Sequence, residues 1–587
     1  MKTVSDFLIE RLKAWGVARI YGYPGDGING VMGALSRAGD TIRFIQPRHE
    51  EAAAFMACGH AKFTDEVGVC LGTSGPGAIH LLTGLYDAKA DHQPIVAICG
   101  QKPRRALGGE FQQEVDLLSL FKDVAHEYVE MVTVPAQLRH VVDRAFRIAL
   151  AHRVPTCIIL PSDVQELKAK EPPHEHGTVH SGLGYSAPIV IPGADDLVRA
   201  AEVLNSGKRV AVLIGAGARH AGDEVVRVAD RLGAGIAKAL LGKPALPDTM
   251  PYVTGGIGML GTRPSYEMMR DCDTLLMVGS GFPYAEFLPE EGHARGVQID
   301  IDPRMLSLRY PMEVNLVGDA APTLRALLPL LQQKQDDRWR RTIERNVAEW
   351  WQTLEKRAMQ DGEPINPQRV FWELSPRLPE NVLLSCDTGT SVHWYSRDLK
   401  LRAGVLAAHS GGLASMGAAM PYAIAAKFAY PDRPAMAFVG DGAMQMNGLN
   451  ELITVAKYWQ QWKDPRFIVF VLNNRDLNMV TWEQRVLEGD PKFPASQDLP
   501  DFSYAAYAHL LGFDGYVIDE ARKIVPTLES TLATRRPAVV EIVADPNMPP
   551  LPPHTTAKQA KDYLLALMKG DPDAMKIIRA SAKQLFA

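Results

Sequence analysis

The sequence predicts an α/β protein built from three doubly wound parallel-sheet domains and a C-terminal helical tail. Short apolar runs alternate with helical patterns along almost the whole chain, and each run ends in Gly, Asp, Asn or Ser before a helix. This alternation is typical of parallel strands that are covered by helices on both faces. The chain has 587 residues, which is too long for one hydrophobic core and favours roughly three domains.

The expected strands recur along the chain, and each has a loop at its carboxyl end. In chain order they are ARIYGYPG, VGVCLGTSGPG, PIVAICG, TCIILPSD, RVAVLIGAG, TLLMVGSG, GVQIDID, NVLLSCDTG, PAMAFVGDG, FIVFVLNN and AVVEIVAD. In sheets of this kind, ligands bind at the carboxyl ends of the strands. We therefore expect the functional residues in the loops that follow these runs.

Three segments without an apolar period divide the chain. They are rich in Pro, Gly or His, as linkers are, and they comprise about residues 168–184, 361–368 and 547–559. The domains expected between these linkers comprise residues 1–170, 185–340 and 362–548. The tail then comprises residues 549–587.

The composition is that of an ordinary globular protein, with 46% hydrophobic and 22% charged residues and a net charge of −5. Such a charge gives no electrostatic footprint for nucleic acid, which is therefore not an expected partner. Six scattered cysteines without a CxxC pair argue against a zinc site or a disulfide framework and favour a reducing cytoplasm. The N-terminus predicts an amphipathic helix rather than a signal peptide, and no membrane-spanning stretch of about 18 apolar residues is present.

The segment from Gly440 to Asn474 carries the sharpest chemical signal. One strand ends at Gly440, Asp441 follows in the loop, and the next helix has an N-terminus that favours a phosphate. The next strand ends at Asn473 and Asn474. Adjacent parallel strands would bring a carboxylate and an amide carbonyl to one sheet edge, where these oxygens suit Mg²⁺ shared with a diphosphate. The alternative is an ordinary Asp-Gly turn and an unrelated Asn pair.

This GDG followed by NN resembles the fingerprint of the thiamin-diphosphate-dependent enzymes. The resemblance implies a Mg²⁺ ion held by Asp441, by Asn474 and by the backbone carbonyl of Asp476. The interval between Gly442 and Asn473 holds 30 residues, somewhat more than is usual in the family. The surplus lies in YWQQWKDPR, where a helix passes to a strand, away from the expected ligands.

The segment RHEEAAAFMACGHAKFT, from Arg48, resembles the part of the same family that supplies the catalytic glutamate, which maps to Glu50. In the family this carboxylate contacts the aminopyrimidine ring nitrogen N1′ and favours the imino tautomer, which then removes the C2 proton. Glu51 would point about 100° away along a helix and need not share this role. The alternative is two acids that stabilise a helix N-terminus.

Other loops resemble the family's cofactor contacts: GYPGDGING from Gly22, GTSGPG from Gly72, CDTGT from Cys386 and SGGLASMGAAMP from Ser410. The implied contacts are Gly25, Asp26, Ser74, Gly75, Gly389, Thr390, Ala414, Ser415, Met416, Gly442 and Ala443, besides Asp441 and Asn474. Met416 would lie beneath the thiazolium ring, although a lone Met is more often simple core. The GDG at 25–27 has no NN about 30 residues later, so we do not expect a second metal site there.

The middle of the chain resembles the flavin domain of the quinone-dependent pyruvate oxidases. GAGARHAG at 215–222 is only weakly similar to a dinucleotide loop, but the run from GGIGMLG to QIDIDPRML is similar over nearly its whole length. The implied FAD contacts are Gly258, Met259, Leu260, Gly279, Ser280, Gly281, Phe282, Pro283 and Asp300. The alternative is a site that has lost its flavin.

Overall similarity to the bacterial pyruvate oxidases covers nearly the whole chain and places Phe111 and Gln112 among the catalytic residues. Acetolactate synthases have a lysine before the histidine that corresponds to His126, whereas this chain has Ala125. We therefore expect FAD-dependent oxidative decarboxylation of pyruvate or a similar small 2-oxo acid, with electrons passing to a quinone or oxygen. The alternatives are a non-oxidative decarboxylase or an acetolactate-synthase-like carboligase, and the loop RDLNMVTWEQR fits neither group closely.

The resemblance also implies a homo-oligomer, either a dimer or a homotetramer that is a dimer of dimers. Each site would take Glu50 from one subunit and Asp441 and Asn474 from another. The end of the tail predicts a short basic amphipathic helix, with Lys576, Arg579 and Lys583 beside an apolar set formed by Met575, Ile578, Ala582 and Leu585. By resemblance, it would let a cytoplasmic enzyme contact the inner membrane peripherally; the alternative is a helix docked on its own protein.

Overall fold

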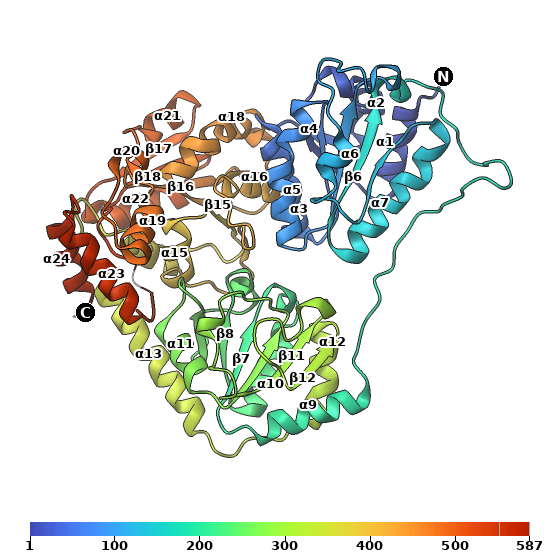
Figure 1. The fold of residues 1–587 in the computed structure, drawn as a ribbon. Coiled ribbons are helices and arrows are strands. Elements are labelled where there is room, and N and C mark those ends of the chain that lie inside the picture. The colour runs from blue at the N-terminus through green and yellow to red at the C-terminus, as the bar shows by residue number, and fades with distance from the viewer. Residues whose placement is uncertain (551, 586–587) are drawn as a thin grey trace.

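The computed structural model describes residues 1–550 and 552–585, and the prediction of three parallel-sheet domains with a helical tail is confirmed. Three sheets are present in this part of the chain, and each has six strands. Figure 1 shows the first and third domains side by side and the central domain below them. None of the helices described is both long and apolar enough to cross a membrane.

The first sheet has the strand order β2-β1-β3-β4-β6-β5. Its strands are β1 (Arg19–Gly22), β2 (Arg43–Ile45), β3 (Gly68–Gly72), β4 (Ile95–Gln101), β5 (Val129–Met131) and β6 (Pro155–Pro161). The helices of this domain are α1 (Val4–Ala14), α2 (Asn29–Ala38), α3 (Glu50–Thr64), α4 (Pro76–His80), α5 (Leu82–Ala90), α6 (Leu117–Phe121), α7 (Leu138–His152) and α8 (Ser162–Gln165). Side chains of α1, α2 and α7 cover one face, and those of α3, α5 and α6 cover the other.

The third sheet has the order β14-β13-β15-β16-β18-β17, which repeats the order of the first. Its strands are β13 (Leu383–Cys386), β14 (Leu406–Ala408), β15 (Ala435–Gly440), β16 (Phe467–Asn473), β17 (Asp514–Ile518) and β18 (Ala538–Val543). Its helices are α14 (Pro367–Leu374), α15 (Thr390–Arg397), α16 (Ala419–Ala429), α17 (Asp441–Ala443), α18 (Leu449–Tyr458), α19 (Asn478–Glu483), α20 (Pro494–Gln497), α21 (Tyr504–Leu510) and α22 (Ile524–Leu532).

The first and third domains share one hydrophobic core. Helix α3 packs against α16, and the buried residues between the two sheets form a single cluster. Alanines dominate the facing surfaces, with Ala53, Ala54 and Ala57 on α3 and Ala423 and Ala426 on α16. Small side chains allow two helices to approach closely, so the N-terminus of α3 is fixed relative to the third domain.

The central sheet has the order β12-β11-β10-β7-β8-β9 and its own hydrophobic core. Its strands are β7 (Val210–Ile214), β8 (Gly235–Lys238), β9 (Val253–Gly256), β10 (Thr274–Val278), β11 (Arg295–Asp300) and β12 (Val314–Val317). Its helices are α9 (Ala194–Ser206), α10 (Gly222–Leu232), α11 (Arg263–Asp271) and α12 (Ala320–Leu327). Counted from β9, the strand order is 3-2-1-4-5-6, the order typical of dinucleotide-binding sheets.

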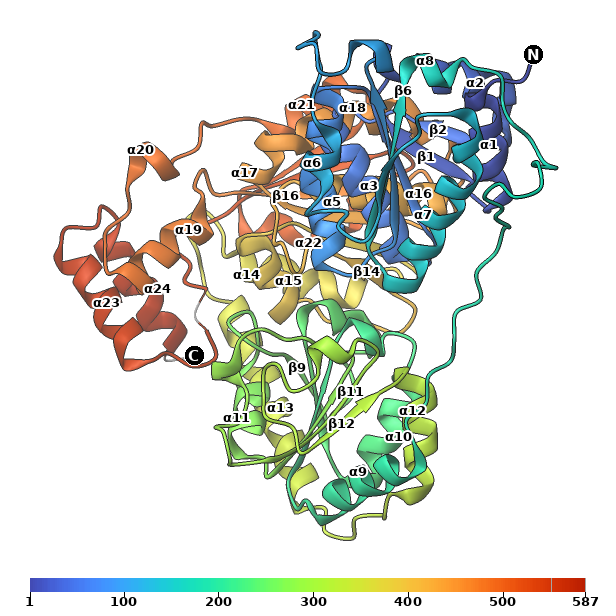
Figure 2. The same ribbon diagram turned by 45° about the vertical axis from the view of Figure 1, so that its right-hand side comes forward.

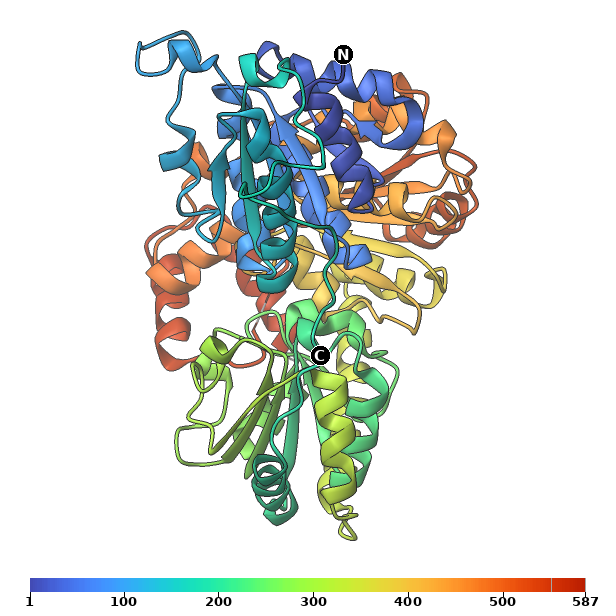
Figure 3. The ribbon, with the colours of Figure 1, turned by 90° about the vertical axis from the view of Figure 1, so that its right-hand side faces the viewer.

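Residues 169–193 contain no helix or strand, and Figure 3 shows this segment running along the outside of the molecule to α9. Helix α13 (Arg338–Ala358) connects the central and third domains. The tail forms α23 (Ala557–Met568) and α24 (Ala574–Leu585), which lie near α19 and α20 in Figure 2.

The final helix is where the sequence predicted it, but its docked face differs from the expected apolar set. Ile577 is fully buried, whereas the side chains of Met575 and Ile578 are 65% and 47% exposed. The side chain of Leu585 lies outside the described residues. The buried ion pair between Arg485 and Asp571 helps to set the docked orientation of the tail.

Candidate functional site

Asp441 and Asn474 lie next to each other, as expected from the ends of adjacent strands β15 and β16. Asp441 is 3% exposed. Its Oδ2 accepts hydrogen bonds from the backbone N–H groups of Asn474 (2.9 Å) and Arg475 (2.6 Å), and its Oδ1 accepts one from that of Gly442 (2.9 Å). Burial raises the pKa of Asp441 to about 7. A cation beside this carboxylate would favour its charged form, so the donor set fits Mg²⁺.

The carboxylate of Asp476 is already engaged by protein groups. Its Oδ1 accepts hydrogen bonds from Thr481 (2.8 Å) and forms an ion pair with Lys492 (3.0 Å), and its Oδ2 accepts one from Asn478 (2.9 Å). The side-chain Oδ1 of Asn474 accepts a hydrogen bond from the backbone N–H of Asp476 (3.2 Å). The backbone carbonyl oxygen of Asp476 accepts one hydrogen bond, from the backbone N–H of Asn478 (2.6 Å), and keeps a second lone pair, so it is the oxygen of this residue that fits a metal ion, in line with the sequence prediction.

The loop before α15 leaves space for an anion. Gly389 is the N-cap of this helix and has a φ of 112°, a conformation that favours glycine. A Cβ at Gly389 would meet no atom within 4 Å, so the helix N-terminus, which begins at Thr390, faces open space. Unpaired backbone N–H groups at such an end attract phosphate. The position fits the diphosphate contact that was expected of Gly389 and Thr390.

Met416 lies beside the turn that carries Asp441. A Cβ added to Gly442 would come within 3.2 Å of the Met416 methyl group and within 2.6 Å of a Leu477 methyl group, so the two side chains pack closely on this glycine. The preceding Ala414 has a φ of 54°, and the backbone N–H of Ser415 donates to Ser410 Oγ (2.8 Å). The predicted residues of this loop and of the turn, including the buried Ala443, are therefore brought together.

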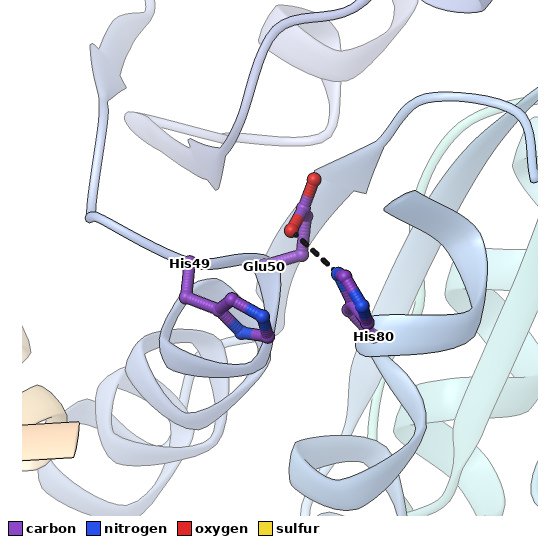
Figure 4. A group of neighbouring side chains, drawn as sticks. All are labelled: His49, Glu50 and His80. Carbon is purple, nitrogen blue, oxygen red and sulfur yellow. Dashed lines mark hydrogen bonds and ion pairs between the residues drawn. The ribbon is translucent and has the colours of Figure 1, made fainter. Parts of the chain in front are cut away.

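Glu50 opens α3 and lies among side chains of the first domain. Its Oε2 is hydrogen-bonded with Nδ1 of His80 (3.1 Å), as Figure 4 shows, and the His49 and His80 rings face each other with their centroids 4.4 Å apart. Its Oε1 would lie 3.3 Å from a Cβ at Gly77. Glu51 points elsewhere, as predicted, and accepts a hydrogen bond from Asn447 of the third domain (3.0 Å). His80 was not singled out from sequence, because nothing in the segment GAIHLL indicates that it faces Glu50.

The other predicted loops of the first domain gather at the carboxyl edge of its sheet. A Cβ at Gly25 would collide with Thr73, at 2.5 Å. Ser74 Oγ donates to Gln113 (3.2 Å), and Gly75 has a φ of 64° and also approaches Gln113. Gln113, the residue that follows the predicted Gln112, therefore contacts both Ser74 and Gly75.

Three predicted residues of the first domain face outward in the single chain. The side chain of Asp26 is 64% exposed and forms an ion pair with Lys102 (3.1 Å). Phe111 is 51% exposed, and Gln112 is also exposed. None of these three therefore belongs to a closed pocket formed by one chain alone.

The part of the site around Glu50, in the first domain, contacts the part around Asp441, in the third domain, but Glu50 itself does not bind to it. Glu51 and Asn447 connect them, yet within residues 1–550 and 552–585 no hydrogen bond or ion pair is recorded between Glu50 and Asp441, Asn474 or Asp476. Glu50 is instead engaged within its own domain.

In the central domain, the predicted flavin residues lie at the point where the strand order reverses, between β7 and β10. A Cβ at Gly215, after β7, would lie 2.4 Å from the carbonyl oxygen of Gly279, after β10. A Cβ at Gly258 would lie 3.0 Å from Phe282. Asp300 ends the neighbouring β11, and burial raises its pKa.

The remaining predicted residues of this site belong to the same loops. They are Met259 and Leu260 between β9 and α11, and Ser280, Gly281 and Pro283 after β10. In open sheets of this order, the reversal point is where a dinucleotide binds.

Known family models match all three domains. They are described as the thiamine pyrophosphate enzyme N-terminal TPP binding domain (residues 2–120), central domain (197–327) and C-terminal TPP binding domain (387–542). These ranges include both halves of the site and the central switch point.

Three relatives illustrate the range of similar proteins. The chain is 35% identical over 589 residues to the putative thiamine pyrophosphate-containing protein YdaP of Bacillus subtilis (strain 168), with 100% of both chains covered. It is 32% identical over 455 residues to the pyruvate oxidase of Lactiplantibacillus plantarum, covering 77% of this chain and 74% of that one. It is 30% identical over 554 residues to the acetolactate synthase isozyme 3 large subunit of Escherichia coli (strain K12), covering 91% and 92%.

Proposed function

This chain belongs to the thiamine pyrophosphate enzymes, and from that premise we propose that it oxidatively decarboxylates pyruvate or a similar small 2-oxo acid. The proposed cofactors are thiamin diphosphate, Mg²⁺ and FAD, and the electrons pass to a quinone or oxygen. The observation that carries the oxidative part is the central sheet, whose dinucleotide-type strand order places Gly215 and Gly279 together at its switch point.

The third domain supplies the groups that would hold the metal and the diphosphate. Asp441 and Asn474 offer side-chain oxygens, Asp476 offers its backbone carbonyl, and the N-terminus of α15 offers backbone N–H groups. Mg²⁺ prefers oxygen ligands of this kind and shares them with phosphates. Met416, beside Gly442, would support the ring system of the cofactor.

Glu50 of the first domain would handle the proton at the cofactor's aminopyrimidine ring. When bound, thiamin diphosphate supplies a nucleophilic carbon and an electron sink for loss of CO2. The Glu50 carboxylate would hold a proton at a ring nitrogen, and the hydrogen bond with His80 Nδ1 would fix the orientation of this carboxylate. The buried apolar residues of α3 exclude water from the side of the helix that faces the shared core.

The second candidate function is carboligation. Acetolactate synthases are similar over 91–94% of this chain, which favours it. Against it stands Ala125 before His126, where a lysine is expected in acetolactate synthases. Product analysis separates the two functions because they use the same cofactor but release different carbon compounds.

The test is to incubate the protein with pyruvate, thiamin diphosphate and Mg²⁺ under anaerobic conditions, with and without a soluble dye as electron acceptor, and to identify products by NMR. The proposal predicts acetate and CO2 whose formation requires the acceptor. Acetolactate formed without the acceptor would establish the carboligase, and acetaldehyde would establish a simple decarboxylase. A Glu50→Gln variant is the control for activity that does not arise from this site.

We also propose that the active enzyme is at least a homodimer, in which Glu50 of one subunit serves the metal site of another. Two observations support this arrangement: among the described residues Glu50 is hydrogen-bonded within its own domain and Asp441 within the third, and Phe111 is exposed in the single chain. Inactive Glu50→Gln and Asp441→Asn chains, reassembled as mixed oligomers, should recover part of the activity. A fully active monomer in solution would overturn it.

For the tail we propose a peripheral contact of this cytoplasmic enzyme with the inner membrane. The exposed Met575 and Ile578 lie on a helix that also carries Lys576, Arg579 and Lys583, a combination that suits an anionic interface. Reduction by pyruvate should increase co-sedimentation with anionic vesicles, and deletion of residues after about 560 should abolish the increase. If binding is the same with and without pyruvate, the tail is a docked structural element.

A further inference from the structure

The loop that carries Met416, residues 409–417, is bound at both ends by carboxylates from different domains. At its end, Asp387 of the third domain accepts hydrogen bonds from the backbone N–H groups of Gly417 (2.9 Å) and Ala419 (3.1 Å). At its start, the partner comes from the first domain. The position of Met416 therefore depends on contacts outside its own domain.

Asp91, one residue beyond α5, binds the start of the loop with both carboxylate oxygens. Its Oδ2 accepts a hydrogen bond from the backbone N–H of Gly411 (2.9 Å), and its Oδ1 accepts one from that of Gly412 (2.6 Å). Two amides held by one carboxylate fix both the distance and the orientation of the peptide plane between them. The first domain thereby sets the path of a loop that belongs to the third.

Lys62 of α3 completes this contact. Its Nζ lies 2.6 Å from Asp91 Oδ2, 2.8 Å from the carbonyl oxygen of His409 and 2.7 Å from Tyr422 Oη, and it forms a longer ion pair with Asp87 (3.6 Å). All three donors of the ammonium group are thus used. One lysine holds both the carboxylate that binds the loop and the residue with which the loop begins.

The electrostatics keep this pair charged although it is buried. Burial alone would raise the pKa of Asp91, but the Lys62 ammonium and the two backbone N–H groups hold that pKa below its ordinary value. Burial would lower the pKa of Lys62, but Asp87 and Asp91 raise it above its ordinary value. Desolvation largely offsets the attraction in a buried pair, so its main effect here is on geometry.

The two glycines of the loop are packed closely against the other two domains. A Cβ on Gly411 would lie 2.6 Å from Leu241 of the central domain, and one on Gly412 would lie 2.8 Å from the carbonyl oxygen of Ala90. Arg219 of the central domain also donates a hydrogen bond to the backbone carbonyl of Lys62. The three domains therefore meet at this point.

We propose that Lys62 and Asp91 are positioning residues for the reaction: they fix the loop so that Met416 supports the thiamin diphosphate ring in its reactive geometry. The inference rests on the proposed function, because it assigns Met416 to the cofactor. Neither residue touches the cofactor site directly; both act through Gly411 and Gly412. A shift of the ring by about 1 Å can cost on the order of 100-fold in rate.

The test compares Asp91→Asn with Asp248→Asn. Asp248 is also a buried aspartate between lysines, with Lys238 at 2.6 Å and Lys243 at 2.9 Å, and it also binds a backbone N–H across a domain boundary, that of Leu401 (2.8 Å). Among the described residues, Asp248 forms no hydrogen bond or ion pair with residues 409–417. Both variants remove one buried charge, but only Asp91→Asn removes a hydrogen-bond acceptor of the loop.

Asp91→Asn should lower kcat by about tenfold to 100-fold, raise the dissociation constant for thiamin diphosphate and change the near-UV circular dichroism of the bound cofactor. Both variants should lower the melting temperature by a similar amount. Asp248→Asn should nevertheless leave kcat and the affinity for thiamin diphosphate within about twofold of the wild type. Equal losses in both variants, or an Asp91→Asn enzyme with unchanged kcat and cofactor spectrum, would overturn the proposal.

A second variant covers the case in which Asp91→Asn does not fold. Gly412→Ala keeps the ion pair but displaces the loop, and it should reproduce the loss of kcat and the altered cofactor spectrum. Gly193→Ala is its control, since the nearest atom to a Cβ there is 3.8 Å away. If the wild-type protein does not consume pyruvate, the proposed function fails, whereas cofactor affinity and circular dichroism still decide the role of the loop contact.

Discussion

The first and third sheets have the same strand order, and both domains contain a Gly-Asp-Gly turn, yet the two turns have different environments. Asp26 follows β1, is largely exposed and pairs with Lys102. Asp441 follows β15, is buried and accepts three backbone hydrogen bonds. The same tripeptide therefore has a buried carboxylate in one domain and an exposed one in the other, and only Asp441 has the environment proposed for the metal site.

The corresponding strands of the two sheets explain this difference. The counterpart of β15 in the first sheet is β3, which is followed by Thr73 and Ser74 rather than by a carboxylate. The counterpart of β16 is β4, which ends at Gln101 where β16 ends at the Asn pair. In the first domain the acidic group comes instead from a helix, as Glu50. One sheet is thus suited to a metal diphosphate and the other to a ring that exchanges a proton.

The largest expected effect is that of Glu50→Gln. If the first domain handles the proton, this change should lower kcat by about 10²–10⁴-fold while the protein still folds and binds thiamin diphosphate. Steady-state kinetics together with calorimetric titration of the cofactor measure both quantities. Near-normal turnover would contradict the proposal that the first domain handles the proton through Glu50.

The next effect concerns the two aspartates of the Gly-Asp-Gly turns. Asp441→Asn should weaken binding of Mg²⁺ and of thiamin diphosphate together, on the order of 100-fold or more, because even groups behind a metal ligand contribute 10–100-fold. Asp26→Asn removes an ion pair that is exposed in the single chain and leaves every proposed metal ligand in place, so it should not weaken Mg²⁺ binding. Equal effects on cofactor affinity in the two variants would show that the comparison is mistaken.

Thermal stability should separate the same two variants. Mg²⁺ and thiamin diphosphate added together at about 100 times their dissociation constants should stabilise the wild type by about 2.7 kcal/mol. Asp26→Asn should show the same rise in melting temperature, and Asp441→Asn at the same concentrations should show almost none. A full rise in the Asp441→Asn variant would remove Asp441 from the metal site.

The smallest effect is expected next to Glu50. Glu51→Gln keeps an acceptor for the hydrogen bond from Asn447, so the free energy of unfolding should change by less than about 1 kcal/mol and kcat should stay within about twofold. Denaturant titration and kinetics measure the two values. A loss as large as that of Glu50→Gln would mean that the two acids act together.

The sequence predicted the features that local patterns determine. The ends of β15 and β16 placed Asp441 beside Asn474 because adjacent parallel strands end at one edge. The core shared by α3 and α16 could not be predicted, since alanine-rich segments do not show which helix they face. The contact of Asp91 with Gly411 joins residues 320 positions apart. A periodic pattern in the sequence cannot predict a contact between residues so far apart.

The tail shows a related limit. The periodicity of its final segment predicted a helix, and the helix is present. It did not predict which face docks, because that choice depends on the Arg485–Asp571 ion pair and on the packing of Ile577. A short stripe of apolar residues indicates a helix more firmly than it indicates the partner of that helix.

The most direct test of the proposed function is the absorption spectrum of the purified protein under anaerobic conditions, before and after pyruvate is added with thiamin diphosphate and Mg²⁺. The account predicts a yellow flavoprotein whose flavin absorbance is bleached by pyruvate in the wild type and is retained in the Glu50→Gln variant. A colourless protein that consumes pyruvate, or a flavin absorbance that stays unchanged while CO2 is released, would contradict it.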